Sequence, residues 1–224
     1  MAPVSPASVD RRERERVEKR EMILQAALRL FLDHSFDKTT MRRIADAVEY
    51  TPGALYSYFK DKDEILYALH TRGFEKFMAM QRAELLDVVE PMERLRAIGR
   101  VYVRFGLANP EYYHLMFIAR STGKKIVEKE SWDPGMQAYM LLRDTMAAVI
   151  DTHGLAVDPD VASYTCWSAV HGMVSLMLCD RCVMMEAHLD LDVCVDQAYG
   201  FLMQLFEAAA AESASARRPE TPRT

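Results

Sequence analysis

Hydrophobic and polar residues follow one another along this chain with the spacing of helices rather than of strands. In residues 21–31, EMILQAALRLF, one apolar stripe at helical spacing contains Met22, Ile23, Ala26, Ala27, Leu30 and Phe31. The sequence lacks sustained polar/apolar alternation and has no Asn-Gly or Asp-Gly turn between β-branched runs. The pattern therefore predicts an all-α protein.

Helix starts are marked by a capping residue followed by proline, whose missing N–H costs nothing at the first helical position. Such pairs occur at Thr51-Pro52, Asn109-Pro110, Asp133-Pro134 and Asp158-Pro159, and Asp61 with Glu64 resembles a capping box. With the periodicity, these signals predict about nine helices, at residues 12–34, 40–47, 52–58, 62–86, 91–108, 110–120, 134–153, 159–181 and 191–211.

Both ends of the chain are poor in apolar residues. The Pro/Ser/Ala-rich beginning and the ending ESASARRPETPRT offer too little apolar surface to pack. The sequence thus predicts a disordered arm over residues 1–14 and a disordered tail over residues 212–224.

Residues 40–59 read as two short helices joined by a turn. Their inward-facing residues are Ile44, Ala45, Val48, Leu55 and Phe59. This leaves the small, compact start of the second helix, from Pro52 to Ser57, on the outside. A helix-turn-helix has this spacing, and its second helix enters the major groove with its first turn.

The run TTMRRIADAVEYTPGALYSYFKDKDEIL resembles the DNA-binding region of the tetracycline-repressor (TetR/AcrR) family of bacterial regulators, with Gln25 to Phe31 in its first helix. The resemblance implies a three-helix DNA-binding domain over residues 15–66. A larger helical domain for ligand binding and dimerisation would follow over residues 67–211. One departure from the family pattern is Glu49. The family usually has glycine in this turn, where the backbone has a positive φ that is sterically costly for other residues.

The resemblance also implies which residues contact DNA: Thr40, Arg42, Thr51, Pro52, Ala54, Tyr56, Ser57, Tyr58 and Lys62. Of these, Tyr56 and Lys62 are expected to bind phosphate oxygens. Two simpler interpretations stay open. Tyr58 is equally well explained as a packing residue, and the lysines as a solvated face.

Helix 159–181 is apolar on nearly all sides, so it must be buried on nearly all sides. Its small residues Ser168, Gly172, Ser175 and Cys179 form one face on which another helix can approach closely. With Phe201, Leu202 and Leu205 of helix 191–211, this face predicts a four-helix interface between two copies of the chain. The pattern of Trp167, His171 and Gly172 further resembles the WHG subgroup of the family.

Aromatic and thioether side chains between these regions are mostly expected in an ordinary core. As a set, they also predict an adaptable apolar site for a small-molecule effector, lined by Phe77, Tyr102, Phe105, Tyr113, Phe117, Met136, Met140, Trp167 and His171. His171 either hydrogen-bonds the effector or is a satisfied core or interface histidine.

Composition indicates the cellular compartment of the protein and the distribution of charge along the chain. The sequence has no apolar run long enough for a membrane span and no secretory signal, which favours the cytoplasm and no membrane partner. Residues 1–66 carry 12 Lys+Arg and 12 Asp+Glu, so the net charge of −5 belongs to the rest of the chain. A neutral module binds DNA if its cations are grouped on one face.

The alternatives concern the cysteines and catalysis. Cys179 and Cys182, with His188 and Cys194, offer soft ligands for zinc or a redox-sensing pair, although the second Cys-x-x-Cys of a structural site is missing. A helical enzyme or ligand carrier is a rival of another class. The sequence shows no Ser/His/acid grouping, phosphate-binding glycine loop or metal-binding His/Glu helix, so neither catalysis nor a cofactor is expected.

The sequence therefore predicts a homodimeric regulator, most simply a repressor. It would bind a palindromic operator in double-stranded DNA and be released by a small, largely apolar effector. The effector, the operator sequence, the regulated genes and the choice between repression and activation are not encoded in these patterns.

Overall fold

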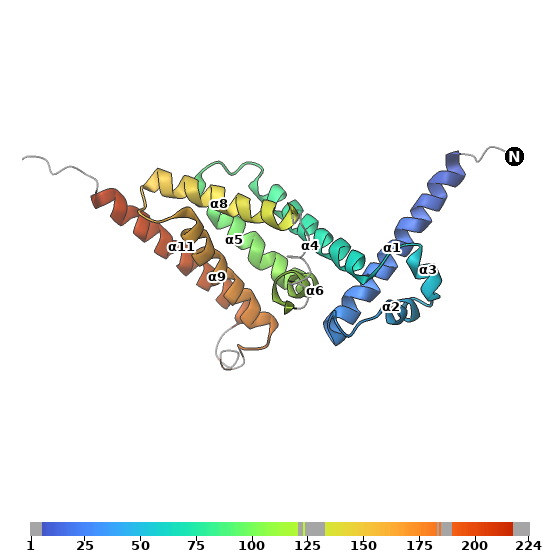
Figure 1. The fold of residues 1–224 in the computed structure, drawn as a ribbon. Coiled ribbons are helices and arrows are strands. Elements are labelled where there is room, and N and C mark those ends of the chain that lie inside the picture. The colour runs from blue at the N-terminus through green and yellow to red at the C-terminus, as the bar shows by residue number, and fades with distance from the viewer. Residues whose placement is uncertain (1–5, 121–122, 124–132, 183, 185–189, 217–224) are drawn as a thin grey trace, which may run out of the picture. The chain divides into compact units, whose positions relative to one another are not determined.

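The fold of the chain was examined in a computed structural model, which describes residues 6–120, 123, 133–182, 184 and 190–216. All secondary structure in this part of the chain is helical (Figure 1). Its elements are α1 (Pro6–His34), α2 (Met41–Ala47), α3 (Pro52–Tyr56), α4 (Lys62–Leu85), α5 (Pro91–Ala108), α6 (Pro110–Tyr113), η1 (His114–Ile118), α8 (Asp133–His153), α9 (Pro159–Leu178) and α11 (Leu191–Ala216).

The described residues form two compact units. One takes its residues from Met1–Gly73 and Glu111–Trp132, the other from Phe74–Pro110 and Asp133–Thr224. Helix α4 runs without interruption from the first unit into the second. The first unit therefore contains the predicted helix-turn-helix, and the second contains the bundle of long helices.

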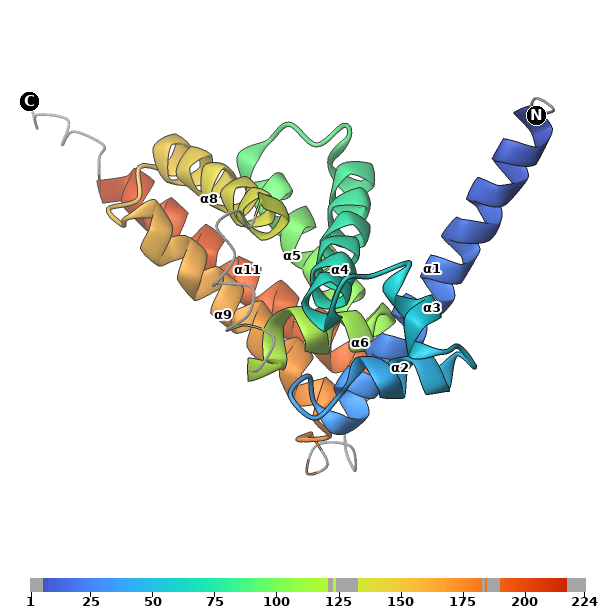
Figure 2. The same cartoon turned by 45° about the vertical axis from the view of Figure 1, so that its right-hand side comes forward.

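In the first unit, α2 packs against α1 and α3 packs against α2 (Figure 2). The buried side chains between them include Ile23, Leu28, Ile44, Leu55 and Ile65, all fully buried. The first turns of α1 extend beyond α2 and α3, and residues 11–19 are exposed. The core thus fixes α3 from below while its first turn faces outward.

In the second unit, α5 packs closely against both α8 and α9 (Figure 1). Gly99 of α5 makes room for Tyr199 of α11, because a Cβ there would lie 2.4 Å from the tyrosine oxygen. The same hydroxyl donates to the backbone carbonyl of Arg96 at 2.8 Å. Burial raises the pKa of Tyr199 well above its usual range, which keeps this hydroxyl protonated as a donor.

Three of the predicted helix caps are confirmed. The Thr51 side chain accepts a hydrogen bond from the N–H of Ala54, and Asp158 caps α9 in the same way. Asp61 accepts from Glu64 N–H, while the Glu64 carboxylate accepts from the N–H of Lys60, one residue earlier than in a standard capping box. These local signals explain why the helix starts predicted at these three caps agree with the structure.

Several predicted features differ from the structure. Residues 6–14, expected within a disordered arm, form the start of α1, since strong helix formers and an Arg11–Glu15 ion pair support a helix there. At the other end, α11 continues to Ala216. The predicted stripe on α1 also includes Met22, which is 48% exposed, whereas Leu24 and Leu28 are buried.

The segment predicted as one helix over residues 110–120 is divided. A short α-helix, α6, passes at His114 into a π-helical turn, η1. Asn109, expected to cap this segment, instead donates its side-chain amide to the carbonyl of Phe105 at the end of α5. Single π turns are uncommon and are frequently found at functional sites.

Candidate nucleic-acid interface and effector site

The tip of α3 is exposed as the helix-turn-helix prediction requires. Leu55 is fully buried beneath the helix, while Tyr56 is 55% exposed on its outer side. The other exposed residues around this tip are Thr51, Pro52, Gly53, Ala54 and Ser57. No side chain lies within 4 Å of the position that a Cβ on Gly53 would take, so another molecule can approach the backbone there.

The turn between α2 and α3 contains Glu49 at φ 58, the left-handed conformation that favours glycine. The sequence-based expectation of a positive φ at this position is confirmed. The Glu49 carboxylate is exposed beside α3. This turn therefore combines a conformational cost with a negative charge next to the candidate interface.

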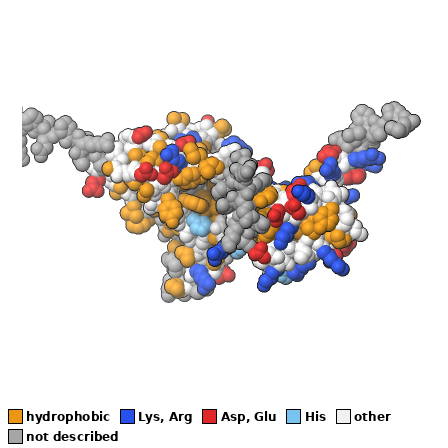
Figure 3. Space-filling view, viewed as in Figure 1, with side chains coloured by type: hydrophobic (Ala, Val, Ile, Leu, Met, Phe, Trp, Pro, Cys, Tyr) orange, Lys and Arg blue, Asp and Glu red, His pale blue; other side chains and the backbone are white. Residues whose placement is uncertain are grey.

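Exposed cationic side chains precede and follow α3 in the sequence, and Figure 3 shows Lys and Arg side chains interspersed with Asp and Glu on the surface of this unit. Arg42 and Arg43 of α2 are exposed, and Lys60 is exposed just after α3. Thr40 caps α2 by accepting from the N–H of Arg43, which fixes the start of the helix that carries these two arginines. This part of the surface offers several groups that can bind phosphate oxygens.

Lys62 has a structural role that the sequence did not reveal. Its ammonium donates to the backbone carbonyls of Phe36 at 2.9 Å and Thr39 at 3.2 Å. It also lies 4.3 Å from the centre of the Phe36 ring. The side chain thus fastens the start of α4 to the segment after α1, and one of its three N–H groups is left for another acceptor.

Tyr58 is half-buried, and its ring packs against that of Tyr50. Its backbone carbonyl accepts a hydrogen bond from Arg20 of α1. The Arg20 guanidinium also lies 3.9 Å from the centre of the Phe59 ring and 3.5 Å from the Glu64 carboxylate. Packing against Tyr50 thus explains the partial burial of the Tyr58 side chain. Arg20 fixes the end of α3 to α1.

The segment α6–η1 contacts α1 and α4 within the first unit. Gln25 of α1 donates to the hydroxyl of Tyr112 at 3.4 Å. Met116 packs close to Gly73 of α4, where a Cβ would lie 2.4 Å from the methionine sulfur. The chain leaving α5 therefore docks directly on the helices of the helix-turn-helix unit.

The predicted effector residues belong to both units. Phe77, Tyr102 and Phe105 pack ring against ring in the second unit, with centroids 5.8 and 5.1 Å from that of Phe77. Tyr113 and Phe117 pack against each other in the first unit. On the surface of α8, Met136 and Met140 are 52% and 38% exposed, respectively.

A chain of hydrogen bonds joins the aromatic group to α9. The Trp167 N–H donates to the Tyr102 hydroxyl at 3.1 Å, and this hydroxyl pairs with Nδ1 of His171 at 3.0 Å. Nε2 of His171 pairs with the Ser175 hydroxyl at 3.3 Å. Burial lowers the pKa of His171, which favours a neutral ring with both nitrogens engaged. These contacts fit the interpretation of His171 as a satisfied core histidine.

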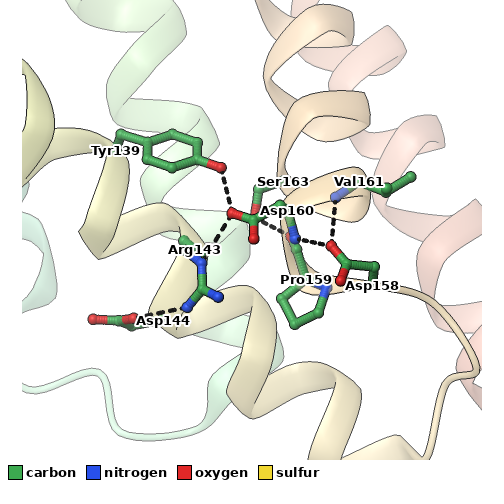
Figure 4. Close-up of polar contacts among 8 residues, drawn as sticks. All are labelled: Tyr139, Arg143, Asp144, Asp158, Pro159, Asp160, Val161 and Ser163. Carbon is green, nitrogen blue, oxygen red and sulfur yellow. Dashed lines mark hydrogen bonds and ion pairs between the residues drawn. The ribbon is translucent and has the colours of Figure 1, made fainter.

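An exposed polar cluster fastens α8 to α9 (Figure 4). The Asp160 carboxylate accepts from the Tyr139 hydroxyl at 2.7 Å and from Nε of Arg143 at 2.9 Å. These hydrogen bonds lower the pKa of Asp160, and the same carboxylate raises the pKa of Tyr139. The cluster orients the start of α9, which carries Trp167 and His171 further along.

The outer face of α9 and α11 is apolar and exposed. Tyr164 and Leu176 of α9 are 66% and 52% exposed, and Phe201 and Leu205 of α11 are 60% and 53% exposed. Gly172 has no atom within 4 Å of its would-be Cβ, and Ser168 and Cys179 are exposed nearby on α9. Leu202 is half-buried, and Ser175 turns toward His171.

The cysteines give little support to a metal or redox site. No group of three or more potential metal ligands occurs among the described residues, and His188 lies outside them. Cys179 is exposed, whereas Cys182 and Cys166 are buried. Burial raises the pKa of the Cys166 thiol to about 11, so it is unreactive at neutral pH. Within the described residues, no helix is both long and apolar enough to span a membrane.

Comparison with known proteins gives relatives for both parts of the chain. Residues 23–69 match the profile "Bacterial regulatory proteins, tetR family", and residues 95–202 match "Tetracyclin repressor-like, C-terminal domain". The chain is 35% identical over 75 residues to the HTH-type transcriptional repressor Rv1474c of Mycobacterium tuberculosis, covering 33% of this chain and 40% of that protein.

A second relative is the HTH-type transcriptional activator FasR of Mycolicibacterium smegmatis, 29% identical over 114 residues, with 50% of this chain and 52% of that protein covered. The chain thus spans about half, or less, of the length of these two relatives. The solved structure of the fatty acid degradation regulator FadR from Bacillus halodurans shares the fold, with a TM-score of 0.63 at 18% identity, covering 83% of this chain and 94% of that one. Because the two profiles account for both the helix-turn-helix and the helical region that follows it, the chain belongs to the TetR family of bacterial regulatory proteins.

Proposed function

We propose that this chain is a transcriptional repressor that binds a palindromic DNA operator as a homodimer and is released by a small, largely apolar effector. The observation that carries the proposal is the exposed first turn of α3 above a fully buried Leu55. A capped helix with small leading residues can enter a major groove with this turn, so α3 is the candidate recognition helix.

The exposed side chains on and around α3 have two proposed roles, binding phosphates and contacting base edges. Arg42, Arg43, Lys60 and the Tyr56 hydroxyl bind phosphates and position the recognition helix. The first turn, from Thr51 to Ala54, faces base edges and determines which sequence is preferred. The module as a whole has no excess of cations, so its affinity depends on the grouping of these few side chains.

The exposed apolar face of α9 and α11 supports the proposed dimer. Side chains such as Phe201 and Leu205 would be half exposed to water in a single chain. A second copy placing the same face against them would bury both, in the manner of an isologous four-helix interface. Each dimer would then present two recognition helices to half-sites about 34–36 Å apart.

The bundle of the second unit is the proposed effector region, centred on Phe77, Tyr102 and Phe105. Two covalent routes lead from it to the first unit: α4 itself, and the chain from α5 into α6–η1. An effector that binds one arrangement of α4 more tightly would shift the population of the dimer toward that arrangement. Repression is the simpler outcome, although the activator FasR shows that relatives of this chain include both kinds of regulator.

The proposal is tested by selecting duplexes from a random library with the full-length chain and measuring their affinity by fluorescence anisotropy. A palindromic site bound at least ~1,000-fold more tightly than scrambled DNA is expected. The variant Tyr56→Phe should weaken binding to all duplexes alike, whereas Ala54→Ser should change the preferred sequence. Equal affinity for every duplex would contradict the proposal.

A further inference from the structure

The side chain of Gln81, on α4, is only 2% exposed, and its Oε1 has no hydrogen-bond partner among the described residues. Leaving a buried carbonyl oxygen unpaired costs free energy, so native proteins rarely do it without a reason. One other side-chain atom in this part of the chain is in the same position, Nε2 of His153, but that residue is partly exposed at the end of α8.

Gln81 lies between the aromatic group and the core beside the α4–α5 loop. One turn before it on α4, Phe77 contacts Tyr102 and Phe105. One turn after it, Leu85 packs against Ala97 and Ile98. These contacts run in opposite directions along the two helices, so α4 and α5 are antiparallel here. The same register places position 81 across from the part of α5 around Val101, which is fully buried.

The buried residues on either side of Gln81, Phe77 and Leu85, are apolar, and the ion pair that joins Glu84 of α4 to Arg104 of α5 is exposed. No Lys, Arg, Asp or Glu is buried in the described part of the chain. The neighbouring polar group, the Tyr102 hydroxyl, already receives the Trp167 N–H and pairs with His171. Gln81 is therefore the residue of this region that retains an unused acceptor, and no buried ion is present to compensate a charged ligand.

The backbones of α4 and α5 also lie farther apart than those of α5 and its close partners α8 and α9. The backbones of α8 and α9 approach α5 closely, whereas α4 is not among the closely packed partners of α5. Large side chains, Phe77 and Leu85 among them, fill the space instead. Such side chains can rearrange around a guest more easily than tightly packed helix backbones.

We infer that Gln81 is the polar recognition residue for the effector, and that the effector is an uncharged, mostly apolar molecule whose O–H or N–H donates to Oε1 of Gln81. This inference rests on the proposed function, since it assigns a ligand class to the effector region. An anion would enter without a partner of opposite charge, and a pure hydrocarbon would leave the carbonyl unpaired.

The test uses four probes built on a straight eight-carbon chain: 1-octanol, octanamide, octanoate and 1-methoxyoctane, which lacks the O–H donor. Binding to the full-length wild type is measured by quenching of tryptophan fluorescence, and again with Gln81→Met, which removes the carboxamide at similar volume. Gln137→Met, on the exposed face of α8, is the matched control.

The wild type should bind 1-octanol and octanamide about 10-fold more tightly than 1-methoxyoctane or octanoate, as one net hydrogen bond predicts. Gln81→Met should lose this difference, and Gln137→Met should keep it. Because Gln81→Met also removes an unpaired buried group, its Tm should rise by roughly 2–6 °C.

Three outcomes would overturn the inference: a lower Tm for Gln81→Met, an unchanged preference for 1-octanol in that variant, or failure of both donor probes to bind the wild type. These outcomes are distinguishable from failure of the proposed function. Operator selection by the wild type without any probe decides whether the chain is a sequence-specific regulator.

Discussion

Arg20, on α1, donates a hydrogen bond of 2.6 Å to the backbone carbonyl of Tyr58, 38 residues later and just beyond α3. The same guanidinium lies over the Phe59 ring and beside Glu64. One long side chain therefore holds the end of α3 through three kinds of contact. Arg20 belongs to the DNA-binding unit without any need to contact DNA.

Replacing this arginine should loosen the recognition helix. Arg20→Met is expected to lower the free energy of unfolding by about 1–3 kcal/mol, because it removes a charge-assisted hydrogen bond to a carbonyl. Operator affinity should fall with it. Arg29→Met changes an exposed arginine of the same helix and should leave both quantities unchanged. Urea denaturation of the two variants decides, and equal stability would show that the Arg20 contacts are not formed in solution.

Two lysines close to α3 should behave differently. Lys62→Met is expected to destabilise the chain by about 1–3 kcal/mol, since Lys62 binds the carbonyls of Phe36 and Thr39. Lys60→Met should leave stability unchanged, because Lys60 is exposed, but should reduce the salt dependence of operator binding by a slope of about 0.9 per lost phosphate contact. Thermal unfolding and anisotropy at several salt concentrations separate the two. If Lys62→Met were as stable as the wild type but showed a reduced salt dependence of operator binding, Lys62 would contact DNA and have no structural role.

The left-handed turn at Glu49 leads to a prediction about strain and charge. Glu49→Gly should raise the free energy of unfolding by up to about 1 kcal/mol and also tighten operator binding, because it removes both the strained φ and a nearby negative charge. Glu49→Gln should tighten binding alone. Ser35→Gly, at the other residue with a positive φ among the described residues of this unit, should raise stability alone. If Glu49→Gly and Glu49→Gln were equally stable, strain would contribute nothing at this turn.

The apolar face of α9 and α11 predicts how the chain associates. Leu205→Glu should convert a dimer into monomers at micromolar concentration, because a second copy would have to bury an unpaired carboxylate. Leu86→Glu is the matched control, since Leu86 is 81% exposed in the loop after α4. Sedimentation velocity gives the oligomeric state of both variants. A dimeric Leu205→Glu would place the interface elsewhere on the chain.

Buried His70 predicts a loss of stability in mild acid. Desolvation lowers its pKa from 6.5 to about 4, so the folded chain keeps the ring neutral while the unfolded chain protonates it near pH 6.5. This contribution is complete above pH 6.5 and declines as the pH falls toward 4. Between pH 7 and 5, His70 should account for about 2 kcal/mol of lost unfolding free energy. In urea denaturation, His70→Gln should lose that part of the pH dependence, whereas His34→Gln, at an exposed position, should retain it.

Much of the helical framework could be predicted because its signals are local. The caps at Thr51 and Asp158 and the apolar periodicity specify where helices begin and which face is buried. The positive φ of Glu49 was implied instead by the family resemblance, since the family usually has glycine at this turn. Where several local signals agree, a single sequence is sufficient.

Features that depend on distant residues could not be predicted. Nothing in the spacing of the sequence shows that Lys62 meets the carbonyls of Phe36 and Thr39, or that both ring nitrogens of His171 are engaged. The sequence alone does not single out Gln81, because an isolated glutamine on a helix is usually solvated. A buried polar residue among Phe77 and Leu85 at helical spacing was the available signal.

Helix α4 contains 24 residues without a break, from Lys62 to Leu85. At about 1.5 Å per residue, Gln81 and Lys62 are separated by about 28 Å along one stiff rod. A tilt of about 5° pivoting near Gln81 would carry the Lys62 end through about 2.5 Å, comparable to the length of a hydrogen bond. The proposed effector would thus act through leverage, since the helix enlarges a displacement too small to disturb the core in which it begins.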